Sequence, residues 1–427
     1  MVQIERYQNK SVIDTFQTQD EIQFDPSSMG NGFVDRTESI TDYDYFVYHT
    51  ETEIENWSIQ MSERYSDFVE LKKYGKSIEN RDLYALVIKE KSGRSDVPRV
   101  LIDCGVHARE WISHSTCQYF VGQLTNPDSP WSYLRNGIEW HVIPNVNPDG
   151  YAFSWTPTGR FWRKNRNPNN DAATKAAQRE NGANNYGCGF SNGIGVDLNR
   201  NYDIMWSNTN MIGASQYCNQ QSYRGAHAFS EPEAKFHADY MLGKCFRKLE
   251  SVLIKPEFVF LLELLSETLI ENNFSAYLTM HSYAQVILFP YTFSSRAPRP
   301  HNYDEMMALG AKIVKKIGSN WRYGQGRDIF YPAAGGSDDW AHMIAKVPLS
   351  FTFELRDDGY YGFMLPERLI QRAVEEATRG ISAIYDHLAD PVVELDNSQE
   401  SDTDSEGSTA QVTTQAPKVS VFQNFIS

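Results

Sequence analysis

Short apolar runs bounded by turn-forming residues recur along the chain and are typical of β-strands. They occupy residues 83–88, 99–103, 139–144, 276–280 and 349–355. Longer stretches between them carry apolar residues at helical spacing. These cover residues 53–65, 110–123, 231–242, 303–319 and 366–388, and the last has Pro near its first turn. This alternation predicts an α/β domain with a mostly parallel or mixed sheet, whose ligands gather beyond the carboxyl ends of the strands.

The pattern stops at both ends of the chain. Residues 1–40 are polar and rich in turn formers, and residues 389–427 read as a disordered acidic tail with one Lys against seven acids. We therefore expect a single folded domain at residues 41–388. The first ten residues lack the apolar core of a signal peptide.

Composition excludes several classes of protein. The 427 residues are 41% apolar and 22% charged, which is typical of a globular chain. Forty Lys and Arg against 55 Asp and Glu give a net charge of −15, which argues against a nucleic-acid partner. No window reaches the roughly 18 apolar residues of a membrane span, so we expect no membrane insertion.

Two histidines and one glutamate stand where metal ligands are expected. His107 and Glu110 lie three residues apart directly after the strand 99–103, and His281 follows the strand 276–280. Two imidazoles and a carboxylate, with a fourth position left for water, are the pattern of catalytic zinc. The pair His-x-x-Glu alone is a weak signal, and a single strand-end His is more often a satisfied polar residue.

Further polar residues gather at other predicted strand and loop ends. Glu354 ends the strand 349–355 and is a candidate general base, or alternatively an ion-pair partner of Arg356. Residues 160–166 (RFWRKNR) and 197–202 (DLNRNY) combine Arg with Asn, which suits recognition of a carboxylate. The alternative for Lys164 and Arg166 is a solvated basic patch.

Six collinear motifs resemble the zinc metallocarboxypeptidases of the carboxypeptidase A/B family. They are HAREW (107–111), FWRKNR (161–166), VDLNRNY (196–202), MHSYAQ (280–285), YPAAGGSDDW (331–340) and FTFELRDDGYYGF (351–363). The resemblance implies a single-domain twisted sheet flanked by helices on both faces and one Zn²⁺ per chain. It also implies that peptide and protein C-termini are the substrates and that the protein is a monomer.

The resemblance further implies a role for each matching residue. Those roles are zinc ligands (His107, Glu110, His281), general base (Glu354), carbonyl polarisation (Arg163), binding of the terminal carboxylate (Asn199, Arg200, Tyr331) and an outer carboxylate contact (Arg109). Asp338 matches the pocket floor, and Gly326 and Thr292 match positions that are small or hydroxylated in the B-type enzymes. We therefore expect a preference for C-terminal Lys or Arg.

Several alternatives stay open at this stage. Asp338 or Asp339 could pair with an internal Arg. A separate alternative is an A-like preference for apolar C-terminal residues. A zinc deacylase of the aspartoacylase kind shares the His-x-x-Glu pair and the distant His. A non-catalytic zinc-binding paralogue is the alternative from a different functional class.

The cysteines, and two segments that differ from the family pattern, give the remaining expectations. By resemblance, Cys104 pairs with Cys117 and Cys188 with Cys218, which indicates a secreted protein. Residues 1–40 are interpreted as a possible remnant of a pro-region, with more sequence upstream. Residues 243–266 are extra relative to the family, and we interpret them as a retained intron or gene-model error.

Overall fold

The protein is described by a computed structural model that covers residues 43–90, 97–169, 193–206, 213–243, 274–318 and 320–389. All of these belong to one compact unit, Met1–Asp390. The predicted segments 1–40 and 390–427, most of 243–266, and Cys188 lie outside the described residues.

Eight strands form a single mixed sheet in the order β1-β2-β4-β3-β5-β8-β6-β7. Their bounds are β1 Val69–Lys76, β2 Asp82–Ile88, β3 Arg99–Cys104, β4 Glu139–Ile143, β5 Ala276–Ser282, β6 Val286–Phe289, β7 Arg322–Gln325 and β8 Leu349–Leu355. The four central strands β4, β3, β5 and β8 run parallel, as do β6 and β7, whereas the other three neighbouring pairs are antiparallel. The predicted mixed, mostly parallel sheet is confirmed.

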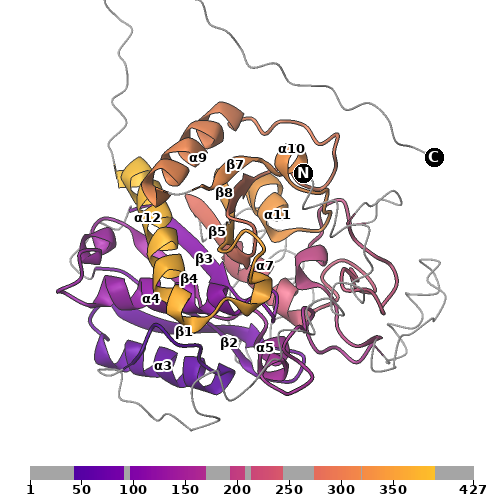
Figure 1. The fold of residues 1–427 in the computed structure, drawn as a ribbon, viewed down its shortest axis with the longest axis horizontal. Coiled ribbons are helices and arrows are strands. Elements are labelled where there is room, and N and C mark those ends of the chain that lie inside the picture. The colour runs from indigo at the N-terminus through magenta and orange to yellow at the C-terminus, as the bar shows by residue number, and fades with distance from the viewer. Residues whose placement is uncertain are drawn as a thin grey trace, which may run out of the picture. The chain divides into compact units, whose positions relative to one another are not determined.

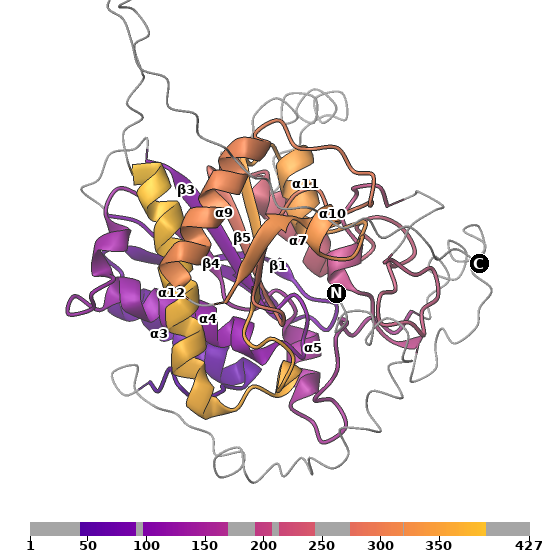
Figure 2. The ribbon, with the colours of Figure 1, turned by 45° about the horizontal axis from the view of Figure 1, so that its top comes forward.

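Helices cover both faces of this sheet (Figure 1). The α-helices are α3 Glu51–Arg64, α4 Trp111–Thr125, α5 Pro148–Ser154, α7 Pro232–Met241, α9 Tyr303–Ile317, α10 Gly326–Ile329, α11 Ser337–Met343 and α12 Ile370–Ala389. Short 3-10 helices are η3 Ser132–Arg135, η5 Leu198–Arg200, η6 Gly362–Met364 and η7 Glu367–Leu369. Helices α9 and α12 lie side by side across one face, and α7 and α11 cover the other (Figure 2).

Strand alternation separates the two hydrophobic cores. On β5, Leu278 and Met280 pack into the larger core beneath α4, α9 and α12, whereas Tyr277 packs into the smaller core with α7 and α11. Because successive side chains point to opposite faces, Thr279 and His281 share the face of Tyr277. The same alternation on β8 places Phe353 in the larger core and turns Glu354 toward the smaller one.

All five predicted strands and all five predicted helices are present; the strand at 349–355 has the predicted bounds, and the others have ends shifted by one to four residues. Pro366 does not lie in the first turn of α12, as predicted, but precedes the 3-10 helix η7. Strands β1, β6 and β7 were not predicted. The first and last carry mostly polar residues (VELKKYGK and RYGQ) at the edges of the sheet, where alternation is weak, and the apolar β6 has only four residues.

The register of the central strands brings two candidate site residues together. His281 on β5 is the direct register partner of Glu354 on β8, and both stand in the last two residues of their strands. Paired residues on parallel strands point to the same face, so this register aims both side chains beyond one edge of the sheet.

Within the described residues, no helix combines the length and apolar character needed to cross a membrane.

Candidate active site

The turn after β3 presents two of the predicted ligands. Gly105 has a φ of +74°, and a side chain there would collide with the His114 ring, so a tight glycine turn begins the segment. Glu110 occupies the N-cap of α4 but makes no capping hydrogen bond. Its carboxylate is instead turned toward two histidines, and the backbone is secured by Ser113, whose Oγ donates to the Glu110 carbonyl at 2.7 Å.

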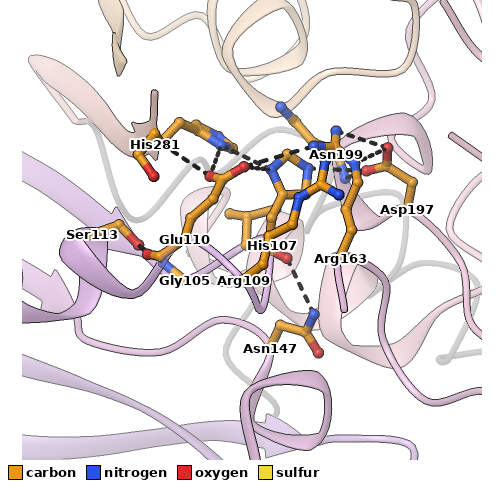
Figure 3. Close-up of polar contacts among 12 residues, drawn as sticks. Gly105, His107, Arg109, Glu110, Ser113, Asn147, Arg163, Asp197, Asn199 and His281 are labelled. Carbon is orange, nitrogen blue, oxygen red and sulfur yellow. Dashed lines mark hydrogen bonds and ion pairs between the residues drawn. The ribbon is translucent and has the colours of Figure 1, made fainter. Parts of the chain in front are cut away.

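Three donor side chains converge at this point, as Figure 3 shows. Glu110 Oε1 lies 2.8 Å from His107 Nδ1, and Glu110 Oε2 lies 3.0 Å from His281 Nδ1. The two Nδ1 atoms are 3.1 Å apart, and all three residues are buried. His107, Glu110 and His281 form the only such group of potential metal ligands within the residues that the structure describes.

The donor set fits Zn²⁺. Burial opposes ionisation of Glu110, but the two histidines outweigh it and hold the pKa of Glu110 well below its ordinary value. Burial likewise opposes a charge on His281, yet Glu110 raises the pKa of His281 to about 9. The point between these groups therefore attracts positive charge. Two imidazoles and a carboxylate are the ligands that catalytic zinc takes.

A buried carboxylate supports the ligand group from behind. Asp197 Oδ1 lies 3.1 Å from His107 Nε2, and its Oδ2 accepts from Arg163 Nε at 3.0 Å. A carboxylate on the far nitrogen of a ligand histidine fixes the ring and its tautomer. Sequence reasoning did not single out Asp197, although its place two residues before Asn199 and the need of a ligand His for an acceptor were available signals.

The two predicted catalytic residues face this group. Arg163 Nη1 lies 3.7 Å from Glu110 Oε1; burial opposes its charge, but Asp197 outweighs burial and raises the pKa of Arg163 further. Glu354 is buried, and burial is the main cause that raises the pKa of Glu354 to about 7, while His281 opposes the rise. The alternative pairing of Glu354 with Arg356 is wrong, because Arg356 forms a two-pronged ion pair with Glu376.

The predicted carboxylate-binding residues lie next to one another. Asn199 and Arg200 stand on η5, and the Asp197 side chain accepts from Asn199 N to begin this turn. Arg200 Nε donates to the Gly213 carbonyl at 2.6 Å, and its Nη2 lies 3.5 Å from the Tyr331 hydroxyl. Arg109 places its guanidinium 4.1 Å above the Phe363 ring, and burial together with Arg163 lowers the pKa of Arg109 to about 10.

Asp338, Gly326 and Thr292 also occupy one neighbourhood. Asp338 is 6% exposed and accepts from Thr352 Oγ1 at 3.2 Å. Its negative charge contributes to raising the pKa of Glu354, after the larger effect of burial. Burial raises the pKa of Asp338. A side chain at Gly326 would collide with Thr292, whose buried Oγ1 has no hydrogen-bond partner among the described residues. Thr352 is a neighbour of the pocket that sequence reasoning missed.

Neither the ion pairs considered for Asp338 and Asp339 nor the surface position considered for Lys164 is found in the described residues. No Lys or Arg pairs with Asp338 or Asp339 in the part of the chain that the structure describes; Asp339 accepts from the backbone N–H groups of Thr292 and Phe293 instead. The interpretation of Lys164 as a surface residue is wrong. Lys164 is buried, its Nζ donates to the Cys218 carbonyl at 2.7 Å, and burial lowers its pKa to about 8.

The predicted disulfide between Cys104 and Cys117 is present and joins the end of β3 to α4. It closes a 13-residue separation that contains both His107 and Glu110. Cys218 is also disulfide-bonded, but its predicted partner Cys188 lies outside the described residues. The ligand turn is therefore covalently tied to the helix that follows it.

Comparisons with known proteins agree with this geometry. The zinc carboxypeptidase family matches residues 54–380. Human carboxypeptidase O is 34% identical over 82% of this chain and 81% of its own length, and bovine carboxypeptidase B is 34% identical over 82% and 73%. The structure of bovine thrombin-activatable fibrinolysis inhibitor in complex with tick carboxypeptidase inhibitor aligns with a TM-score of 0.64 at 33% identity, covering 81% of this chain and 98% of that one. The chain belongs to the zinc carboxypeptidase family and is a metallocarboxypeptidase, a hydrolase of peptide bonds.

Proposed function

We propose that this protein removes C-terminal Lys or Arg from peptides and proteins. His107, Glu110 and His281 would hold the zinc ion, because their three donor atoms face one another and their surroundings attract positive charge. Zinc in such a site polarises a carbonyl oxygen and lowers the pKa of a bound water to about 7. The remaining steps fall to the other side chains of the site.

Glu354 is proposed as the proton carrier. A general base works best when its pKa lies near the operating pH, and burial raises the pKa of Glu354 to about 7. Glu354 accepts a proton from the attacking water and later delivers it to the nitrogen of the leaving amino acid. Arg163, held by Asp197, offers N–H donors to the oxyanion that develops on the scissile carbonyl.

Recognition of a free C-terminus is assigned to η5 and Tyr331. Asn199, Arg200 and the Tyr331 hydroxyl supply N–H and O–H donors, and a guanidinium matches a carboxylate in charge and geometry. Arg109 is proposed to contact a substrate carbonyl or carboxylate further out. An amidated C-terminus lacks the charge that this group requires, so it should not be a substrate.

The proposed preference for C-terminal Lys or Arg rests on the burial of Asp338 and on its lack of a cationic partner among the described residues. The Asp338 carboxylate lies at the proposed pocket floor. A buried unpaired charge is costly, and a substrate ammonium or guanidinium relieves that cost. Gly326 leaves room for a long polar side chain, and the Thr292 hydroxyl, which has no partner among the described residues, offers it a hydrogen bond.

The direct test is C-terminal release from a peptide library with every residue at the last position, read by mass spectrometry. We expect one residue to be lost, Lys and Arg first, and no cleavage of matched amidated peptides. Glu354→Gln should retain zinc but lose at least about 100-fold in rate. Faster release of Phe or Leu than of Arg would favour the A-like alternative, and full activity of Glu354→Gln would refute the proposed base.

We further infer that the protein acts outside the cytosol. The Cys104–Cys117 disulfide encloses the ligand turn, and such bonds persist mainly in oxidising compartments. Expression with a secretory leader should yield protein with this bond intact, as measured by peptide mapping. Recovery of equal zinc-loaded activity from a reducing cytosol would argue against a requirement for export.

A further inference from the structure

A buried hydrogen-bond network lies beneath the proposed carboxylate site and belongs to none of the roles assigned so far. Its centre is Asp103 on β3, which is fully buried. The carboxylate accepts from the Tyr277 hydroxyl at 2.5 Å and from Thr279 Oγ1 at 2.7 Å, and its Oδ2 lies 3.3 Å from His237 Nε2. A buried carboxylate with several donors is rigid, because no water competes for its lone pairs.

One arm of this network reaches the start of α11. The Tyr277 proton is engaged by Asp103, and the Tyr277 oxygen lies 2.9 Å from Ser337 Oγ. Ser337 is the first residue of α11, and its backbone N–H donates to Asn199 Oδ1 at 2.8 Å. Because Oδ1 is held as an acceptor, the Asn199 amide group is oriented with Nδ2 on the opposite side, without a partner among the described residues.

A second arm reaches the other end of η5. Tyr202 OH lies 2.6 Å from His237 Nδ1, and His237 Nε2 lies 3.3 Å from Asp103 Oδ2 without forming a hydrogen bond to it. Tyr202 lies two residues after the end of η5, and its backbone N–H donates to the Gly335 carbonyl at 3.2 Å. The first arm therefore ends on Asn199 itself, and the second ends at Tyr202, two residues after Arg200.

We propose that Asp103 is a positioning residue that holds Asn199 in its substrate-binding orientation through Tyr277 and Ser337. The inference rests on the proposed function of Asn199 as a ligand of the substrate's terminal carboxylate. It applies to the carboxylate and not to the side-chain pocket. Asp338 is held separately from β8, where Thr352 Oγ1 donates to its carboxylate and Ser350 Oγ to its carbonyl.

Two variants interrupt the arm, and one matched variant does not. Ser337→Ala removes the contact between Ser337 and Tyr277, and Tyr277→Phe removes both bonds of the tyrosine hydroxyl. Thr279→Val removes one donor from the same Asp103 carboxylate without touching the path to Asn199. Urea unfolding of all three measures the stability loss that any buried hydrogen bond carries.

The readouts are kcat and KM for an N-acylated dipeptide ending in Arg, and calorimetric binding of L-arginine and of agmatine, which lacks the carboxylate. Ser337→Ala and Tyr277→Phe should raise KM and the Kd of L-arginine by about tenfold, the worth of one hydrogen bond to a charged group. Both variants should keep kcat within about twofold and leave agmatine binding unchanged, because the carboxylate is absent from agmatine. Thr279→Val should change none of these constants.

An equal rise in KM for Thr279→Val, or unchanged L-arginine binding in both arm variants, would overturn the positioning role and leave Asp103 as a core residue. Wild-type protein that binds L-arginine but releases no residue from peptides refutes the proposed function and not this inference. Wild-type protein that binds neither L-arginine nor peptides refutes both.

Discussion

Replacing Asp338 by Asn should lower activity and raise stability at the same time. The substitution keeps the size of the side chain and its contact with Thr352 but removes a charge that is 6% exposed and has no cationic partner among the described residues. Loss of a buried charge pair with a substrate cation costs at least about 2 kcal/mol. That is about 30-fold in kcat/KM for a peptide ending in Arg.

The expected change in stability has the opposite sign. Burial raises the pKa of Asp338, so the folded protein binds a proton more tightly than the unfolded chain, whose Asp has a pKa near 3.9. The free energy of unfolding of the wild type therefore falls as the pH rises above that value. Asp338→Asn has no such loss, so its advantage should grow as the pH rises above about 4.

Two measurements on the same preparations test this reasoning. Hydrolysis is compared for peptides that end in Arg and in Phe, and urea unfolding is followed at several pH values. We expect a large loss for Arg, little change for Phe, and a higher unfolding midpoint at neutral pH. Equal losses for the two peptides, or a less stable variant at pH 7, would show that Asp338 is a structural residue rather than an uncompensated pocket charge.

Two more changes probe the supports of the site, and a third probes a buried carboxylate on α7. Asp197→Asn weakens the contact with His107, so zinc affinity should fall about 10- to 100-fold in a chelator competition, with no change taken as evidence against that support. Gly335→Ala places a methyl group 2.3 Å from the Arg200 carbonyl at a φ of +76°, so KM for Arg-ending peptides should rise; an unaffected KM would show that the loop can adjust. Burial and Glu231 raise the pKa of Glu233 to about 8, so the wild type should lose on the order of 3 kcal/mol of unfolding free energy as the pH rises from about 5 to 8. Glu233→Gln should flatten that slope in urea unfolding, and equal slopes would contradict a protonated Glu233.

The sequence allowed prediction of the central strands because their burial on both faces leaves long apolar runs. The edge strands β1 and β7 escaped prediction, since each carries exposed charged residues, Glu70, Lys73 and Lys76 on β1 and Arg322 on β7. The same contrast holds for the helices: long amphipathic α9 and α12 were found, whereas short α5, α10 and α11 were not.

The residues of the candidate site also differed in how far the sequence allowed their prediction. His107, Glu110 and His281 were recognisable because ligand chemistry limits the residue type and its place at a strand end. Asp197 and Thr352 were not, because what they do depends on a register and a loop path that bring distant segments together. Lys164 was misjudged for a related reason: a long cationic side chain can be buried when one carbonyl, here that of Cys218, accepts its ammonium group.

The register that pairs His281 with Glu354 also has a consequence for how such a protein can diverge. The groups proposed for hydrolysis stand on the central strands, in the turn after β3 and, for Arg163, in the loop after α5, whereas the proposed pocket residues stand after β6 and on α10 and α11. A change at Thr292, Gly326 or Asp338 alters a loop or a short helix without disturbing the strand pairing that aligns Glu354. Selection could therefore retune substrate choice through a few substitutions while the hydrolytic machinery is inherited intact.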